Sequence, residues 1–403
     1  MTQNKKKPSN QKWLATLLYA LLGAAAGALN MHYLFGISRR PGVMRILLFV
    51  ALVVAVYIAM LAQIVIHEAG HLIFGLLTGY RFSSFRIHNW MWIKENGKIR
   101  FRRLSIPGTG GQCLMGPPDL KDGKIPFLLY NFGGAIMNLL TAALFLFLSG
   151  FLGPESFLKL FLQMLALFGV GLAITNGLPL HIGLVDNDGC NALTILRSRK
   201  AMRAFWIQMK ANELSARGVR LKDMPEEWFI QPEEWYETQE KDMDNSLMAT
   251  VGVLTCNRLM DQHRFDEADA LMEHMLSIDS RIVDLHRALL VCDRVFLELI
   301  GLNRKDVLDS LLNRQQKELM KQMTTFPSVI RTEYAYALLA EKDTAKAEKI
   351  LERFEKNAET FPYPSEIETE REMLEIAQQH FVPEETEEAP AEEESEQGSA
   401  ENE

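Results

Sequence analysis

The chain lacks several sequence patterns that define common classes of soluble protein. Its 403 residues contain only four cysteines, and no two of them form a Cys-x-x-Cys pair. A disulfide framework is therefore not expected, and we predict reduced structural thiols. The glycine-rich stretch Pro107–Gln112 has no Walker lysine, which argues against nucleotide binding. The net charge of −8 gives no reason to expect a nucleic-acid partner.

Charge is also scarce in the first half of the chain, where long apolar runs dominate residues 13–180. A helix that crosses a bilayer needs about 20 consecutive apolar residues. Four runs are long enough, at roughly 13–36, 44–78, 127–152 and 157–178. The sequence therefore predicts a multi-pass integral membrane protein that is mainly α-helical and embedded in a lipid bilayer.

Basic residues indicate the orientation of these spans. Lysines precede the first run, nine basic residues lie in the loop at 79–126, and further arginines follow the last run. We therefore expect both termini and this loop to be cytoplasmic. Arg39, Arg40 and Arg45 oppose this orientation, because they lie together in a short loop on the other side.

The stretch Ile64–Phe74, IVIHEAGHLIF, places three ionisable side chains inside the second apolar run. Such side chains are costly at bilayer depth unless they have partners. On a helix, His67 and His71 project from one face because they are four residues apart. This spacing lets two imidazoles bind one Zn²⁺, with Glu68 beside them as the general base for a zinc-bound water.

A catalytic zinc normally has a third protein ligand. The stretch 174–193, ITNGLPLHIGLVDNDGCNAL, follows the fourth run and contains helix-breaking residues together with two aspartates. Irregular backbone at membrane depth is tolerated where it is buried in protein or lines a wet cavity. Asp186 and Asp188 are both candidate ligands, and His181 is a further one. A plain helix exit with an Asp-Gly turn explains the same residues equally well.

The order of these motifs resembles the site-two protease family of intramembrane zinc metalloproteases, of the bacterial type. The resemblance covers about 44–200 and rests on HExxH near the end of one span, followed by Asn-x-x-Pro and Asp-Gly after a later one. It implies that Glu68 is the catalytic base and that Asn176 steadies the substrate carbonyl or oxyanion. The zinc ligands that it implies are His67, His71 and Asp188.

Two features depart from the family pattern. The gap between Asn176 and Asp188 is longer than the usual spacing, and Asn187 precedes the Asp-Gly pair where the family commonly has leucine. Asp186 therefore remains the second choice of ligand. We favour Asp188 because Gly189 follows it and can let the chain re-enter a helix.

The third run carries Asn131 and Asn138 at either end of a glycine-rich stretch, similar to one on the family's middle core helix. Small residues permit close approach of the zinc-binding helix. The two asparagines either form hydrogen bonds near the site or make ordinary contacts between helices, and the sequence leaves both alternatives open.

The loop at 85–118 contains two β-prone runs that flank an Asn-Gly pair, which predicts a small β-hairpin. Residues 90–93, Trp-Met-Trp-Ile, suit a membrane interface. The family resemblance implies a membrane-dipping β element here. An exposed strand edge in this loop could bind an extended substrate peptide as an added strand.

The second half of the chain is polar. We expect a first region at 1–43 that contains the extra transmembrane helix, the intramembrane metalloprotease core at 44–200, and an interfacial helix with an acidic linker at 201–242. Residues 243–382 form helical hairpins with tetratricopeptide-like positions, although a plain helical bundle fits as well. The glutamate-rich segment 383–403 has the composition of a disordered tail.

The fold class we expect is mainly α: a polytopic bundle of about four spans, one broken near the zinc site, with a small β-hairpin and a soluble helical domain. The leading functional hypothesis is a zinc metalloendopeptidase that cuts membrane-embedded proteins in regulated intramembrane proteolysis. The alternative is a catalytically silent, metal-bearing scaffold. In either case a cytoplasmic partner protein binding through 243–382 is a hypothesis. A proton-relay transporter is a third interpretation, which too few spans disfavour.

Overall fold

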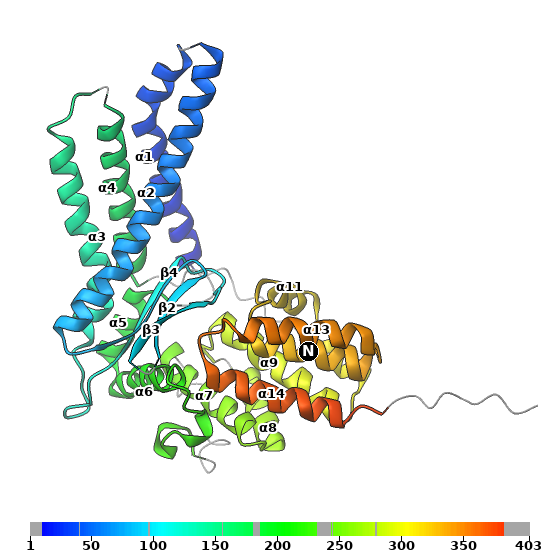
Figure 1. The fold of residues 1–403 in the computed structure, drawn as a ribbon. Helices are drawn as coiled ribbons and strands as arrows, with labels where there is room; N and C mark the ends of the chain where they lie inside the picture. The colour runs from blue at the N-terminus through cyan, green and yellow to red at the C-terminus, as the bar shows by residue number, and fades with distance from the viewer. Residues whose placement is uncertain are drawn as a thin grey trace, which may run out of the picture.

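The computed structural model describes residues 10–382 apart from 40, 96, 155, 180–185, 232–242, 244 and 279. Within these residues the protein is mainly helical, as expected, and contains one small antiparallel sheet (Figure 1). The sheet has four strands, more than the single hairpin that the sequence predicts. Long helices form an extended bundle on one side of the sheet, and short helices form a compact domain on the other. The bundle helices are α1 (Asn10–Ser38), α2 (Gly42–Leu77), α3 (Phe127–Ser149) and α4 (Phe157–Gly177).

Among the described residues, three helices are long and apolar enough to cross a membrane, namely α2, α3 and α4. The expected span at 13–36 lies within α1, and that α1 also crosses the membrane stays a prediction. Helix α2 has 36 residues, so at 1.5 Å per residue it is about 54 Å long, well beyond the ~30 Å hydrocarbon core. Its C-terminal part flanks the sheet (Figure 1).

Helices α2 and α3 cross at a pair of glycines. A Cβ atom on Gly70 would lie 2.3 Å from the carbonyl oxygen of Gly133, and a Cβ atom on Gly133 would lie 2.7 Å from the carbonyl oxygen of Gly70. No side chain fits at either position, so the two backbones touch directly. This contact brings the HEAGH turn of α2 against the first half of α3.

The sheet has the strand order β3-β2-β1-β4 and is antiparallel throughout. The predicted Asn-Gly hairpin is confirmed, because Glu95 pairs with Lys98 across a two-residue connection. All four strands are short, with six or seven residues each. The strands are β1 (Arg81–Ile87), β2 (Trp90–Glu95), β3 (Lys98–Arg103) and β4 (Gly111–Gly116).

Strand β2 alternates between two environments. Met91 and Ile93 are fully buried in a hydrophobic cluster shared with the C-terminal helices. Trp90 and Trp92 point to the other face and remain 55% and 38% exposed. The prediction that all four residues suit a membrane interface is therefore wrong for Met91 and Ile93. The period-two alternation of a strand separates them from the tryptophans, and the helical domain covers their face.

Two helices connect the bundle to the C-terminal domain. Helix α5 (Asp188–Arg197) begins after the break that follows α4, and α6 (Arg199–Ser215) packs beneath β4 and the start of α3. Asn187 and Ser198 cap α5 and α6 by accepting hydrogen bonds from backbone amides three residues on. The four cysteines are all free and buried, as expected for structural thiols.

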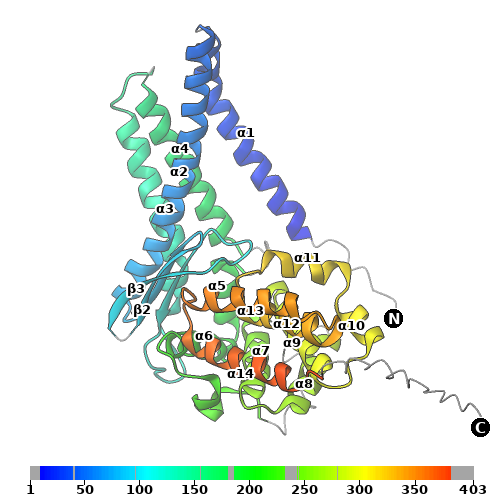
Figure 2. The ribbon, with the colours of Figure 1, turned by 45° about the vertical axis from the view of Figure 1, so that its right-hand side comes forward.

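The C-terminal domain consists of short helices around a single hydrophobic cluster (Figure 2). Whether they form true repeats stays a prediction. The domain is joined to the sheet through the backbone, because the amide of Arg103 on β3 donates to the carbonyl of Thr360 at 2.9 Å. Its helices are α7 (Ser246–Asp261), α8 (Phe265–Ser277), α9 (Asp284–Ile300), α10 (Lys305–Leu311), α11 (Arg314–Gln322), α12 (Pro327–Ala335), α13 (Thr344–Ala358) and α14 (Pro364–Gln379).

Candidate metal centre

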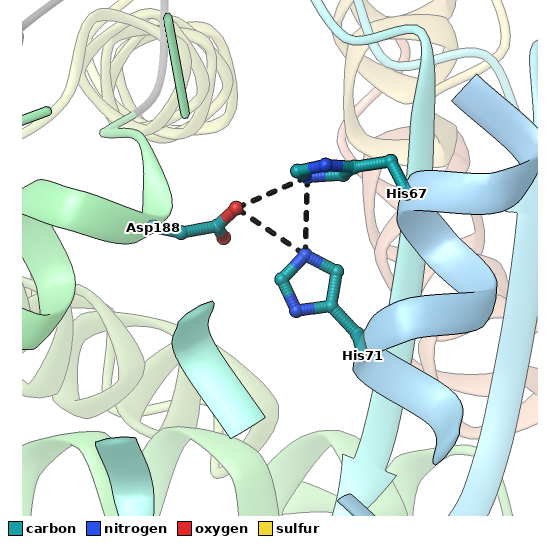
Figure 3. A group of neighbouring side chains, drawn as sticks. All are labelled: His67, His71 and Asp188. Atoms are coloured by element: carbon teal, nitrogen blue, oxygen red, sulfur yellow. Dashed lines mark hydrogen bonds and ion pairs between the residues drawn. The ribbon is translucent and has the colours of Figure 1, made fainter. Parts of the chain in front are cut away.

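Three side chains from two separate helices meet at the end of the bundle (Figure 3). His67 and His71 lie one turn apart on α2, and Asp188 is the first residue of α5. Each imidazole Nε2 lies 3.2 Å from Asp188 Oδ2, and the two Nε2 atoms lie 3.2 Å from each other. Both histidines are buried. The three donor atoms therefore form a nearly equilateral triangle that faces a common centre.

This triangle has the size that a zinc ion requires. With zinc–ligand distances of about 2.0–2.1 Å, two ligands of a tetrahedral site are separated by about 3.3 Å. The 3.2 Å separations match this edge length on all three sides. Two imidazoles and one carboxylate are also the donor types that catalytic zinc sites use, and they leave the fourth position open. The residues present therefore fit the ion.

The orientation of His67 is fixed by an amide network that joins three helices. His67 Nδ1 lies 2.6 Å from Oδ1 of Asn138 on α3. The amide nitrogen of Asn138 donates to the backbone and side-chain oxygens of Gln63, and the Gln63 amide donates to the Leu165 carbonyl on α4. Because Asn138 Oδ1 must then accept, we assign the proton to Nδ1 of His67. Its Nε2 lone pair is left to face the centre.

His71 is oriented in a simpler way. Its Nδ1 lies 2.8 Å from the backbone carbonyl oxygen of Tyr130, which can only accept. The proton is therefore again on Nδ1, and Nε2 is free to bind a cation. Space for the His67 ring comes from Gly134, where a Cβ atom would lie only 2.5 Å from the ring. The sequence places Asn138, Tyr130 and Gly134 in the third apolar run. Only the crossing of α2 and α3 shows that they contact the two histidines.

Asp188 is positioned by the residue before it. The Asn187 side chain caps α5 by accepting from the amide of Cys190, and its own amide donates to the carbonyls of Thr175 and Leu178 at 2.7 and 2.6 Å. It thereby ties the end of α4 to the start of α5. Burial raises the pKa of the Asp188 carboxyl, but the two imidazoles outweigh burial and hold that pKa below its ordinary range. Asp188 is an anion there.

Glu68 lies beside the triangle and is not part of it. Its side chain is buried, and it makes no hydrogen bond or ion pair within the described part of the chain. Strand β4 passes directly against it, because a Cβ atom on Gly111 would lie 2.6 Å from Glu68 Oε1. A buried carboxylate next to a metal site and free of other partners can accept and release a proton.

Other sequence candidates lie elsewhere. Asp186, the second choice of ligand, accepts a hydrogen bond from the Ser246 hydroxyl at the start of α7. Asn176 lies in the last turn of α4, and its amide donates to the Leu172 carbonyl of the same helix at 3.1 Å. No hydrogen bond joins Asn176 to the triangle among the described residues. His181 lies outside the described residues.

Part of the sequence also matches a known protein family. Residues 42–223, a little under half of the chain, match the family model described as Peptidase M50B-like. The match supports the resemblance to the site-two protease family. It indicates a membrane metallopeptidase. The three long apolar helices are consistent with an integral membrane protein, and the family is generally zinc-dependent. The comparisons with curated proteins and with solved structures found no match.

Sequence reasoning missed the residues that orient the ligands. It left Asn138 undecided and read Asn187 only as a departure from the family pattern. Gln63 was not singled out, although it lies one turn before His67 on the same helix. A polar amide one turn from a metal ligand inside an apolar helix is a usable signal, because such groups need partners at that depth.

Proposed function

We propose that the protein is an intramembrane zinc metalloendopeptidase that hydrolyses peptide bonds of membrane-embedded proteins. The observation that carries the proposal is the triangle of His67, His71 and Asp188 with Glu68 buried beside it. A structural zinc site is usually closed by four protein ligands, whereas a catalytic one has three and keeps a carboxylate base nearby. The family match over residues 42–223 supports the same activity.

In the proposed mechanism His67, His71 and Asp188 would hold the ion. Zinc bound there would act as a Lewis acid, able to polarise the scissile carbonyl and to lower the pKa of the attacking water. Glu68 accepts a proton from that water and delivers it to the leaving amine. Its burial among apolar helices excludes bulk water, which strengthens both charge interactions and proton transfer.

The sheet offers a place for the substrate chain. Strand β4 is an edge strand, and no further strand lies beyond it among the described residues. It borders Glu68 at Gly111. A transmembrane substrate must unwind before cleavage, since helical hydrogen bonds shield its carbonyls, and the extended segment can then pair with this edge. For the oxyanion we propose Asn176, which must exchange its hydrogen bond with Leu172 for one with the substrate.

The setting of this activity is also a proposal. We place the protein in a bacterial plasma membrane, which the resemblance to the bacterial type of the family implies. We place both termini in the cytoplasm, since basic residues are concentrated in 79–126 and after the last apolar run. The expected domain boundaries and a cytoplasmic partner for 243–382 are further parts of the proposal. The shared hydrophobic cluster supports a close association of that domain with the sheet.

Glu68→Gln tests the proposal directly. Because Glu68 is not a member of the triangle, the variant should retain the zinc content of the wild type and lose cleavage. We suggest quantitative proteomics of membrane fragments from cells carrying wild-type, Glu68→Gln or Glu352→Gln protein. Glu352 is an exposed glutamate on α13 and serves as the matched control.

Fragments seen with wild type and Glu352→Gln but absent with Glu68→Gln would identify both the activity and its target. If no membrane fragment depends on Glu68, the chain is not the protease that we propose. A metal-bearing scaffold would then account for zinc binding without cleavage.

A further inference from the structure

The sheet lies between the zinc-binding helix and the C-terminal domain. Strand β4 packs on α2, with Gly111 against Glu68 and Met115 against Gly75. The opposite face of the sheet is buried by the C-terminal domain, which covers Met91 on β2. The face that the C-terminal domain covers and the strand that borders the proposed general base therefore belong to the same sheet.

Arg86 occupies the centre of this covered face. The β1–β2 register pairs it with Met91, so both side chains project toward the C-terminal domain. Arg86 is 1% exposed. Its guanidinium donates to the carbonyl of His88 at 2.5 Å, to Thr109 Oγ1 at 2.6 Å and to the carbonyl of Gly111 at 3.3 Å. One side chain thus binds the turn after β1 and the segment that leads into β4.

This arrangement costs stability. Arg86 forms no ion pair with any described residue, and its buried Nε has no hydrogen-bond partner. Burial lowers the pKa of the Arg86 guanidinium, and the nearby Glu68 and Tyr363 act in the opposite direction. A buried arginine without a carboxylate partner makes the folded protein less stable than an apolar residue of similar size would. We therefore look for its role in the segments that it holds in place.

What it holds is the approach of β4 to Glu68. His88 has a left-handed backbone (φ 56°), and its amide donates to the Gly110 carbonyl at 2.9 Å, which closes the same loop from the other side. Gly111 follows at once and contacts the Glu68 carboxylate. A shift of this loop would therefore change the distance between the edge strand and the Glu68 carboxylate.

We propose that Arg86 is a positioning residue that fixes the first residues of β4 against Glu68, and that the docked C-terminal domain keeps its guanidinium dry. The catalytic part of this inference rests on the proposed peptidase function. The domain contributes through the Arg103–Thr360 backbone bond and through Phe361 and Tyr363, which pack in the cluster that covers the sheet. Exclusion of water strengthens the three hydrogen bonds of Arg86.

The test uses the full-length protein in lipid nanodiscs and measures amide hydrogen exchange. In Arg86→Met, an apolar residue of similar length, we expect the amides of 109–116 to exchange at least about tenfold faster, while those of α2 are unchanged. Arg86→Lys keeps the charge but cannot reach three acceptors at once, so exchange should remain at least about threefold faster than in wild type. Zinc content should not change in either variant.

Two further variants guard the interpretation. Arg102→Met removes an arginine from β3, at the opposite edge of the sheet from β4, where Arg102 pairs with Glu95, and should leave exchange of 109–116 unaltered. Thr109→Val removes one acceptor of Arg86 from a half-buried loop position and should raise exchange about threefold even if Arg86→Met does not fold.

Activity provides a second readout. With a substrate identified by its dependence on Glu68, kcat of Arg86→Met should fall about tenfold or more while KM stays within about threefold, because misalignment affects the reacting geometry of bound substrate. Exchange of 109–116 within twofold of wild type in the Arg86 variants, or in Thr109→Val where those do not fold, would overturn the inference. Faster exchange without any Glu68-dependent cleavage would support the bracing role and reject the peptidase proposal.

Discussion

Asn138 and His67 belong to different helices, yet Asn138 Oδ1 lies 2.6 Å from His67 Nδ1. The contact fixes both the tautomer and the direction of the ring. We predict that Asn138→Ala weakens zinc binding by about 10–100-fold, since loss of such an outer partner typically has this effect. Competition with a chromophoric chelator measures the change.

Asn131 provides the matched control. It is a buried asparagine on the same helix, but its amide donates to the Phe127 carbonyl one turn earlier. Asn131→Ala should therefore leave zinc affinity within about threefold of wild type. Equal losses in the two variants would mean that helix destabilisation, and not orientation of His67, is responsible.

Replacement of each aspartate by asparagine distinguishes the two candidate ligands. Asp188→Asn removes the anion from a triangle whose sides measure 3.2 Å, so zinc affinity should fall by about 100-fold or more. Asp186→Asn can still accept from the Ser246 hydroxyl and should retain zinc. Elemental analysis after dialysis against a weak chelator gives the result, and the reverse pattern would make Asp186 the ligand.

Gly134→Ala should disrupt the metal centre by steric means. The new Cβ atom would lie 2.5 Å from the His67 ring, so the ring or helix α3 must move. We predict at least about tenfold weaker zinc binding, although alanine is otherwise better than glycine in a helix by about 1 kcal/mol. Gly27→Ala in α1 is the control, because nothing lies within 4 Å of its Cβ position. Unchanged zinc affinity in Gly134→Ala would contradict the prediction, because the His67 ring or α3 would then have moved without any loss of zinc binding.

The C-terminal domain should lose stability as pH rises. Burial raises the pKa of Glu370 to about 7, with Arg331 opposing the shift and Asp293 adding to it. A carboxyl whose pKa is raised by folding stabilises the fold in its protonated form. The contribution is fully present below pH 4.5 and is lost as pH rises through about 7. This shift corresponds to roughly 3 kcal/mol at most.

Glu370→Gln keeps the neutral shape and should reduce this dependence without abolishing it, because burial also raises the pKa of Glu366 on the same helix to about 8. Thermal unfolding between pH 5 and 8 would reveal the change. Arg331 retains its 2.6 Å contact with Asp293 in the variant. Glu352→Gln, at an exposed position, should follow the wild-type curve. A wild-type protein whose Tm does not fall across this range would contradict the assignment.

Some parts of the site could be predicted because their signals are local. His67 and His71 share a helix face by spacing alone, and the apolar run around them predicts the helix itself. The hairpin follows from one Asn-Gly pair. Asp188 is different: it lies two residues from Asp186, and spacing gives no reason to prefer either. The asparagine between them decides, because its cap determines which aspartate begins α5.

Contacts between distant elements could not be predicted in this way. The stretch Trp-Met-Trp-Ile at 90–93 has the composition of a membrane interface. Only the docked C-terminal helices show why Met91 and Ile93 are buried. Likewise nothing local in Thr360 indicates a bond to Arg103, since backbone groups pair without regard to side-chain identity. Tertiary burial overrides local preference where two surfaces meet.

The glycine crossing of α2 and α3 has a consequence for how the protein matures. Backbone contact at Gly70 and Gly133, together with the Asn138 and Tyr130 anchors of the histidines, sets the donors by helix packing. Small zinc domains, in contrast, derive much of their folding free energy from the ion. We therefore expect the helices to fold without the ion, so that removal of zinc by a chelator should empty the site reversibly without unfolding the protein.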